Sequence, residues 1–157
     1  MRIGSGFDVH AFGPGDSVVL GGVRIPHTRG VVAHSDGDVV LHALCDALLG
    51  AAGLGDIGMH FPDADPQWKG TASTRFLEHA AMLVKQAGYA LINVDTTVIL
   101  EKPKLKDYRI AIRESLAKSL SLPLDRVSVK FKTAERVGPV GEGLSAEAQA
   151  IVTIAKP

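Results

Sequence analysis

The stretch Arg2-Ile3-Gly4-Ser5-Gly6-Phe7-Asp8-Val9-His10-Ala11-Phe12 decides how the fold begins. Apolar residues alternate in it with glycine and polar residues, and this period of two predicts a β-strand over residues 2–12. Successive side chains of a strand point to opposite faces, so Asp8 and His10 share one face and have glycines beside them. The strand therefore presents a carboxylate and an imidazole side by side.

The rest of the chain alternates between strand-like and helix-like segments. A Gly21-Gly22 turn joins residues 18–20 to residues 23–25 as a short hairpin. Apolar runs with a helical period predict helices over 39–52 and 73–87 and a further one within 103–120. Period-two alternation predicts strands over 92–100, 127–133 and 146–154. We therefore expect one α+β domain over residues 1–157, with a mainly four-stranded mixed sheet and helices packed on one face.

The last predicted strand has an alanine-rich face. Ala146, Ala148 and Ala150 alternate there with polar residues. Side chains this small allow another sheet or subunit to approach closely, and they equally suit packing beneath a helix. Both alternatives stay open from the sequence.

The composition is that of an ordinary globular protein. Of the 157 residues, 46% are hydrophobic and 22% are charged, which is enough for one core without disulfide bonds. Lys plus Arg and Asp plus Glu number 17 each, so no overall field attracts nucleic acid or a membrane, and we expect neither as a partner. The single cysteine, Cys45, and the lack of signal-peptide features near Met1 predict a cytoplasmic location.

A third residue of the metal-ligand type lies near the start of the helix predicted over 39–52. This residue, His42, combines with Asp8 and His10 to offer one oxygen and two nitrogens. Three such ligands and an open fourth position are typical of a catalytic zinc site. The alternative is a solvated carboxylate and two histidines that only pack or cap. Cys45, three residues past His42, is more typical of a small buried hydrophobe than of a ligand.

The surroundings of His42 allow further interpretations. Asp38 and Asp46 lie four residues on either side of it, so either carboxylate can accept the proton of its non-ligating nitrogen, or simply lie on the helix surface. Ahead of the helix, residues 34–38 (His-Ser-Asp-Gly-Asp) gather polar groups where free backbone N–H groups favour a phosphate. Capping of the helix by a residue of this segment explains the same pattern equally well.

Two glycine-containing segments are further candidates for ligand contacts. Residues 53–72 include Gly55-Asp56-Ile57-Gly58 and Phe61-Pro62-Asp63-Ala64-Asp65 and form a loop too long to be a mere connection. Thr133-Ala134-Glu135 ends a strand and leads into residues 138–143, which offer backbone amides beside a hydroxyl and a carboxylate for phosphate and magnesium. Four lysines can neutralise phosphate, although lysines that flank strands are usually just solvated: Lys102, Lys104, Lys130 and Lys132.

Taken together and in this order, the motifs resemble the 2-C-methyl-D-erythritol 2,4-cyclodiphosphate synthase family. The resemblance rests on residues 2–10, 34–38 with His42, 55–65, 102–104 and 133–135, and it runs over nearly the whole chain. It implies conversion of 4-diphosphocytidyl-2-C-methyl-D-erythritol 2-phosphate into the cyclic diphosphate and CMP, a lyase step of non-mevalonate isoprenoid biosynthesis. It also implies a homotrimer with sheets meeting around the trimer axis. Each active site then lies between subunits and holds Zn²⁺ and a second divalent cation, Mg²⁺ or Mn²⁺.

The resemblance also implies roles for individual residues. Zinc is bound by Asp8, His10 and His42, the second cation by Glu135, and the transition state is stabilised by His34 and Thr133. The implied substrate-binding residues are Asp8, Val9, His10, His34, Ser35, Asp56, Ile57, Gly58, Phe61, Pro62, Asp63, Ala64, Asp65, Lys132, Thr133, Ala134 and Glu135. The implied nucleotide-binding residues, supplied by the adjacent subunit, are Leu100, Glu101, Lys102, Pro103, Lys104, Leu105, Lys106 and Phe131.

The chain departs from the family pattern after Glu135. Members commonly carry Gly-Phe-x-Gly-Arg-Gly there, whereas this chain reads Gly138-Pro139-Val140-Gly141-Glu142-Gly143 and lacks the arginine that lines a cavity on the trimer axis. We therefore do not extend to this chain the isoprenoid diphosphate proposed to bind in that cavity. Lys132 either supplies some of the missing charge or is solvated.

Two other functions stay open from the residues alone. One is a zinc-dependent phosphoester hydrolase, in which water attacks phosphorus in place of the substrate's own phosphate. The other is a trimeric nucleotide-binding module that binds the same ligands without turnover.

Overall fold

The computed structural model describes residues 1–62 and 64–157, so the substrate contact predicted at Asp63 lies outside the described residues. The elements in chain order are β1 (Arg2–Gly13), β2 (Ser17–Leu20), β3 (Val23–Pro26), β4 (Gly30–Val31), α1 (Val39–Ala52), α2 (Ile57–His60), η1 (Pro66–Trp68), α3 (Ser73–Gln86), β5 (Ala90–Ile99), η2 (Lys106–Tyr108), α4 (Arg109–Leu120), η3 (Leu124–Arg126), β6 (Val127–Lys132), α5 (Gly138–Gly141) and β7 (Ser145–Ala155). No helix in this part of the chain is long and apolar enough to cross a membrane.

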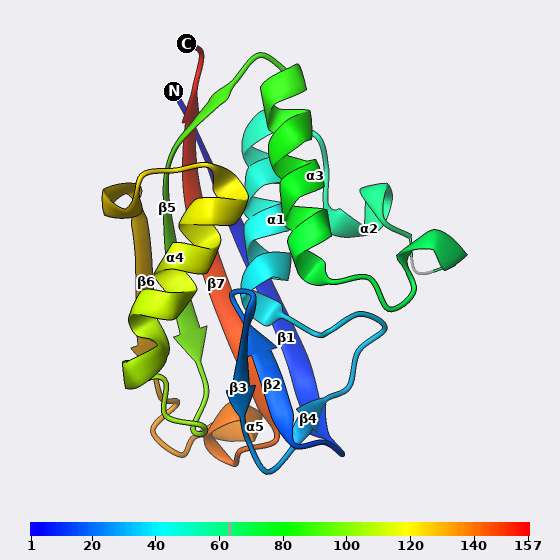
Figure 1. The fold of residues 1–157 in the computed structure, drawn as a ribbon, viewed down its shortest axis with the longest axis vertical. Coiled ribbons are helices and arrows are strands. Elements are labelled where there is room, and N and C mark those ends of the chain that lie inside the picture. The colour runs from blue at the N-terminus through cyan, green and yellow to red at the C-terminus, as the bar shows by residue number, and fades with distance from the viewer. Residues whose placement is uncertain (63) are drawn as a thin grey trace.

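One mixed sheet organises the molecule, with its strands in the order β4-β1-β7-β5-β6. Strand β7 runs antiparallel to β1 and β5, whereas β5 and β6 are parallel. Helices α1, α3 and α4 lie on one face of this sheet (Figure 1), which confirms the predicted α+β domain. The fifth strand, β4, was not predicted, because a strand of two residues is too short to show a periodic pattern. The β2–β3 hairpin forms a separate small sheet.

The helix bounds follow the sequence pattern closely. Helix α1 covers the predicted residues 39–52, and α3 ends one residue before the predicted end. The helix predicted within 103–120 begins only at Arg109, because residues 106–108 first form a 3₁₀ turn. Local periodicity and turn residues therefore suffice for most of the secondary structure.

Helix α1 lies directly on the face of β1 that carries the glycines. A Cβ atom on Gly4 would overlap the carbonyl oxygen of Ala47. The same face of the sheet continues into β7, because Asp8 pairs with Ala148. The alanine side chains of β7 are buried there, and α1 contacts that strand. Packing beneath a helix is therefore the alternative that holds for the alanine-rich face.

The opposite face of the sheet is rich in exposed apolar side chains. Ile3, Phe7 and Val9 alternate with the residues that meet α1, and they are 68%, 51% and 46% exposed. Ile151 on the neighbouring strand β7 is 50% exposed. A row of apolar side chains on one sheet face is typical of a surface that meets another protein.

Candidate active site

Asp8, His10 and His42 come together where β1 meets α1. The Oδ2 atom of Asp8 lies 3.0 Å from Nε2 of His10 and 3.0 Å from Nδ1 of His42, and these two nitrogens are 3.2 Å apart. Strand β1 presents the first two residues on its glycine face, and the first turn of α1 supplies the third. The structure thus brings together the three residues that the sequence singled out, within 4.8 Å of one another.

The outer nitrogen of each imidazole also has a partner. Nδ1 of His10 lies 3.3 Å from the carbonyl oxygen of Val32, and Nε2 of His42 lies 2.8 Å from Oγ of Ser73. With a proton on each outer nitrogen, the inner nitrogens aim lone pairs at the carboxylate of Asp8. Three acceptors that face one another repel, and a divalent cation between them removes this repulsion. The donor set therefore fits a divalent metal with an open coordination position.

The electrostatics of the cluster keep its carboxylate ionised. Burial by itself raises the pKa of Asp8. When both rings are protonated and carry a proton on each nitrogen, hydrogen bonds from His10 and His42, together with the positive charge of the rings, outweigh burial and lower this pKa to about 2. The hydrogen bond to Asp8 in turn raises the pKa of His10, against the effect of burial. An ionised carboxylate is the form that binds a metal cation.

Asp38 caps helix α1 and does not hold the proton of His42. Its carboxylate accepts hydrogen bonds from the Val40 and Leu41 N–H groups, both at 3.1 Å. It also accepts from the N–H groups of Gly21 at 2.9 Å and Gly22 at 2.7 Å, which ties the β2–β3 turn to the helix. Capping is therefore the alternative that holds for this residue. Complete burial raises the pKa of Asp38 to about 6, although the backbone donors oppose the shift.

Asp46 also has a partner other than the predicted His42. Its Oδ1 accepts a hydrogen bond from the Ile57 N–H at 2.8 Å, at the start of α2. Burial raises the pKa of Asp46. The helical spacing correctly placed this carboxylate near His42. However, the carboxylate accepts its hydrogen bond from a backbone N–H group of the following segment, which has no partner within its own helix turn. The partner of His42 is Ser73, thirty-one residues further along the chain, for which the sequence spacing carried no signal.

A cavity of about 310 Å³ lies beside the start of α4 and the end of β6. Its lining combines apolar side chains with lysine and arginine side chains. A site for a nucleotide requires both, because the base needs apolar surface and the phosphates need positive charge. Its lining residues include every residue predicted to bind nucleotide except Glu101 and Lys102: Leu100, Pro103, Lys104, Leu105, Lys106, Arg109, Phe131, Lys132 and Thr133.

Arg109 lines this cavity and was not predicted. Its guanidinium carbon lies 4.7 Å from the centroid of the Phe131 ring, and its Nη1 donates to the carbonyl oxygen of Val129 at 2.6 Å. These contacts hold the ring of Phe131 in place at the cavity wall. The one signal in the sequence was a further cationic residue three positions past Lys106, at the start of α4.

Glu101 holds the turn after β6 through its side chain. Its Oε1 accepts hydrogen bonds from the backbone N–H groups of Ala134 at 2.9 Å and Arg136 at 3.4 Å. The turn needs this support because Glu135 and Arg136 have left-handed backbone conformations, with φ of 52° and 64°. Within it, Thr133 Oγ1 donates to Glu135 Oε1 at 2.7 Å. The predicted Thr133 and Glu135 are therefore presented together.

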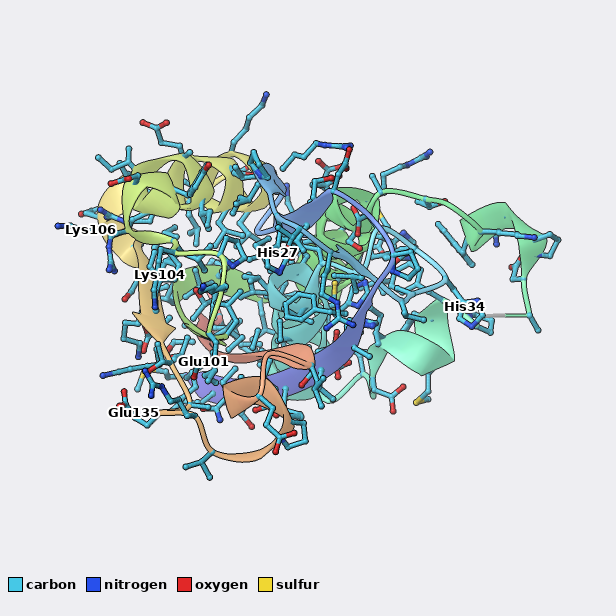
Figure 2. All side chains as sticks on the ribbon, turned by 90° about the horizontal axis from the view of Figure 1, so that it is seen from below. His27, His34, Glu101, Lys104, Lys106 and Glu135 are labelled. Atoms are coloured by element: carbon cyan, nitrogen blue, oxygen red, sulfur yellow. The ribbon has the colours of Figure 1, made fainter. Side chains whose placement is uncertain are left out.

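The predicted site residues form two groups that lie apart within one chain. Figure 2 shows His34 at one end of the molecule, and Glu135, Glu101, Lys104 and Lys106 toward the opposite end. The Thr133 hydroxyl donates a hydrogen bond to Glu135, so Thr133 lies with Glu135 at the end away from His34. A single chain therefore does not bring the predicted pair His34 and Thr133 together. The metal-ligand cluster belongs to the His34 side, since Ser35 Oγ lies 3.3 Å from Nε2 of His42.

The family model for the YgbB family matches residues 1–155. The chain belongs to the YgbB family. A relative from Solibacter usitatus, named 2-C-methyl-D-erythritol 2,4-cyclodiphosphate synthase, is 62% identical over 156 residues, which are 99% of this chain and 98% of the relative. The resemblance inferred from the motifs is therefore confirmed, and so is the prediction of an enzyme of the lyase class.

Two solved structures show how closely the fold of this YgbB-family chain follows its relatives. The bifunctional IspDF from Campylobacter jejuni matches with a TM-score of 0.93 and 43% identity, over 98% of this chain and 42% of that longer chain. A structure of 2C-methyl-D-erythritol-2,4-cyclodiphosphate synthase in its CDP-bound form matches with a TM-score of 0.91 and 43% identity, over 98% of this chain and 100% of the other.

The remaining predicted residues of this YgbB-family chain lie around the His34 group. Asp56 caps α2 through the Met59 N–H at 3.0 Å, and Asp65 caps η1 through the Gln67 N–H at 3.0 Å. Phe61 is buried, with its ring centroid 4.8 Å from that of Phe76 and 5.0 Å from that of Trp68, so it anchors the loop. Pro62 and Ala64 are exposed, as are Asp56, Gly58 and His34, whereas Val9 lies on the face of β1 opposite the cluster.

Proposed function

We propose that the chain converts 4-diphosphocytidyl-2-C-methyl-D-erythritol 2-phosphate into 2-C-methyl-D-erythritol 2,4-cyclodiphosphate and CMP, a step of non-mevalonate isoprenoid biosynthesis. The observation that carries the proposal is the Asp8–His10–His42 cluster, whose donors fit a divalent cation, in a chain 62% identical to a synthase of that name. The nucleotide cavity supports it, because a related structure is described as a CDP-bound form. We assign the reaction to the cytoplasm, in line with the single free cysteine of the chain.

The proposed reaction is a cyclisation within the substrate. An oxygen of the 2-phosphate forms a new bond to the β-phosphorus, while the bond from that phosphorus to the oxygen bridging it to the α-phosphorus breaks. The bonding electrons leave with CMP, and no water enters. Because the nucleophile is already an anion, the protein has to supply no general base. It has to bring two like-charged phosphates together, and such positioning can be equivalent to effective molarities of about 10⁵ to 10⁸ M.

The chain's own residues divide this task between the two groups of the site. Asp8, His10 and His42 would hold zinc, and Glu135 would hold a second cation, Mg²⁺ or Mn²⁺. When bound, such cations supply positive charge that offsets the charge of the phosphates. Lys104, outside these ligands, adds a cationic head to the nucleotide cavity.

Several further residues are proposed to bind and orient the substrate. His34 and the Thr133 hydroxyl stabilise the transition state, and Ser35 contacts the substrate beside the cluster. The loop that begins at Asp56 receives the methylerythritol part. Apolar cavity residues around Phe131 receive the cytosine base, which stacks well on apolar and aromatic surface.

We also propose that the active form is a homotrimer with each site between two subunits. The separation of His34 from Glu135 within one chain supports this arrangement, because a neighbouring subunit can supply the missing group (Figure 2). The exposed apolar face around Phe7 and Ile151 offers a surface on which sheets can meet.

A mixing experiment tests the shared site. His34→Ala and Glu135→Gln subunits are each expected to form inactive trimers. When equal amounts are unfolded together and refolded, about a quarter of the sites combine an intact His34 group with an intact Glu135 group, so activity returns to about that fraction of the parent level. Mixtures as inactive as the separate variants would show that both groups come from one chain.

The reaction itself is tested by phosphorus NMR with CMP detection, with Zn²⁺ and Mg²⁺ present. We expect a cyclic diphosphate and CMP in equal amounts. A linear phosphorylated product would identify a phosphoester hydrolase, and tight CDP binding without CMP release would identify a nucleotide-binding module.

A further inference from the structure

The two nitrogens of the His42 ring face different surroundings. Nδ1 lies 3.0 Å from the Asp8 carboxylate inside the cluster, and Nε2 lies 2.8 Å from Ser73 Oγ. A neutral imidazole carries one proton, and only the other nitrogen can bind a cation. We propose that Ser73, oriented by Asp36, is a positioning residue that holds the proton of His42 on Nε2 and leaves Nδ1 free to bind the metal. This inference rests on the metal site of the proposed function.

The direction of the hydrogen bonds follows from Asp36. This carboxylate receives the Ser73 hydroxyl in a short hydrogen bond, and it also accepts the backbone N–H of Ser73 at 3.0 Å and of Asp38 at 3.2 Å. An ionised carboxylate can only accept. The hydroxyl hydrogen of Ser73 therefore points to Asp36, and a lone pair of its oxygen is left for His42.

Burial makes this arrangement specific. Ser73 is fully buried, so water does not compete for its oxygen. The neighbouring hydroxyl of Ser35 is a weaker partner, because its oxygen lies 3.3 Å from Nε2 of His42 and already accepts the Gly37 N–H. Ser73 Oγ is therefore a stronger hydrogen-bond acceptor for the proton on Nε2 of His42 than Ser35 Oγ is.

The Asp8 carboxylate competes for the same proton from the other side of the ring. A proton on Nδ1 would point to Asp8 and would block the lone pair that a cation needs. The Ser73–Asp36 pair opposes this by offering an acceptor at Nε2. Removing the Ser73 oxygen therefore favours the wrong tautomer, although Asp8, His10 and His42 are all still present.

The test combines the ¹⁵N NMR signals of the His42 ring with zinc affinity measured by competition with a chelator. In the parent protein, we expect the proton on Nε2 both without metal and with zinc. In Ser73→Ala, a larger share of the metal-free protein carries the proton on Nδ1, and zinc affinity falls by about 10- to 100-fold. Asp36→Asn gives the same two changes, because its amide can donate to Ser73 and turn the hydroxyl hydrogen toward His42. Thr71→Ala, which removes a hydroxyl that donates to the Gln67 carbonyl oxygen at 3.3 Å, leaves both readouts unchanged.

Several outcomes separate this inference from the proposed function. A parent protein with the proton on Nδ1, or a folded Ser73→Ala protein with parental tautomer and zinc affinity, overturns the role of Ser73. If Ser73→Ala does not fold, the tautomer and zinc affinity of Asp36→Asn, together with the tautomer of the parent protein, test the role of Ser73 by the same criteria. A parent protein that binds no zinc contradicts the proposed metal site, while its metal-free spectrum still reports the tautomer.

Discussion

Gly6 of β1 lies directly against the backbone of Ala43 in α1, and a methyl group on Gly6 would overlap the Ala43 carbonyl oxygen. This contact sets the distance between the strand that carries Asp8 and His10 and the helix that carries His42. The same glycine face that makes the close approach possible also carries the two ligands of the strand. The fold and the candidate metal site therefore depend on one packing contact.

Gly6→Ala is expected to push α1 away from β1. Overpacking of this kind costs about 1–3 kcal/mol of the free energy of unfolding, and zinc binding weakens because the ligand atoms move apart. Urea unfolding and zinc competition measure the two effects. Gly50→Ala is the matched control, since a Cβ at Gly50 meets no atom within 4 Å, and alanine there stabilises the helix by about 0.5–1 kcal/mol. Equal stabilities for Gly6→Ala and the parent would contradict the prediction.

His42→Ala is expected to remove most bound zinc and leave the fold intact. Nδ1 of His42 lies 3.2 Å from Nε2 of His10 in the candidate metal cluster, while the core of α1 is made by its apolar side chains. Elemental analysis of purified protein measures the zinc content, and circular dichroism checks the fold. His27→Ala removes an imidazole outside the cluster and serves as the control. Unchanged zinc content in His42→Ala would exclude this residue as a ligand.

Glu101→Ala is expected to slow turnover and leave nucleotide binding unaffected. The Glu101 carboxylate holds the backbone of Ala134 and Arg136, and its loss lets Thr133 and Glu135 move. Misplacement of reacting groups by about 1 Å can cost 10²-fold, so we expect kcat to fall by about 10- to 100-fold.

The comparison uses kcat together with CDP affinity measured by calorimetry. Glu114→Ala, on the exposed surface of α4, is the control with parental values. If Glu101 binds the nucleotide directly, as the resemblance implied, the CDP affinity of Glu101→Ala drops instead.

The pH dependence of stability should carry the signature of Asp38. Burial raises its pKa in the folded protein from 3.8 to about 6. The protonated Asp38 carboxyl therefore makes its full contribution to the free energy of unfolding below about pH 3.8. This contribution is lost as pH rises through about 6. With about 1.4 kcal/mol per pKa unit, the loss is about 3 kcal/mol.

Asp38→Asn cannot titrate, and it isolates this contribution. The free energy of unfolding of the metal-free parent minus that of Asp38→Asn should decrease by about 2.4 kcal/mol between about pH 4 and pH 7, because part of the full loss already occurs below pH 4. Urea unfolding at both pH values gives the two differences. A constant difference would show that the pKa of Asp38 is not raised.

Much of the secondary structure and the metal-ligand cluster followed from local patterns. The bounds of α1 were predicted because its apolar period and the capping segment before Val39 lie within a few residues of each other. Asp8 and His10 share a face because of the strand period alone. Arg109 and Ser73 were missed because each reaches its partner through the path of the whole chain, with no local spacing to mark it.

The sequence by itself determined the types of ligand, the elements that carry them and, through the order of the motifs, the family. Only the tertiary structure decided that Ser73 meets His42, that Glu101 holds the turn of Glu135, and that His34 lies far from that turn. The physical reason is the range of the forces involved. Periodicity and capping act over a few residues, whereas contacts between distant segments depend on how the entire core packs.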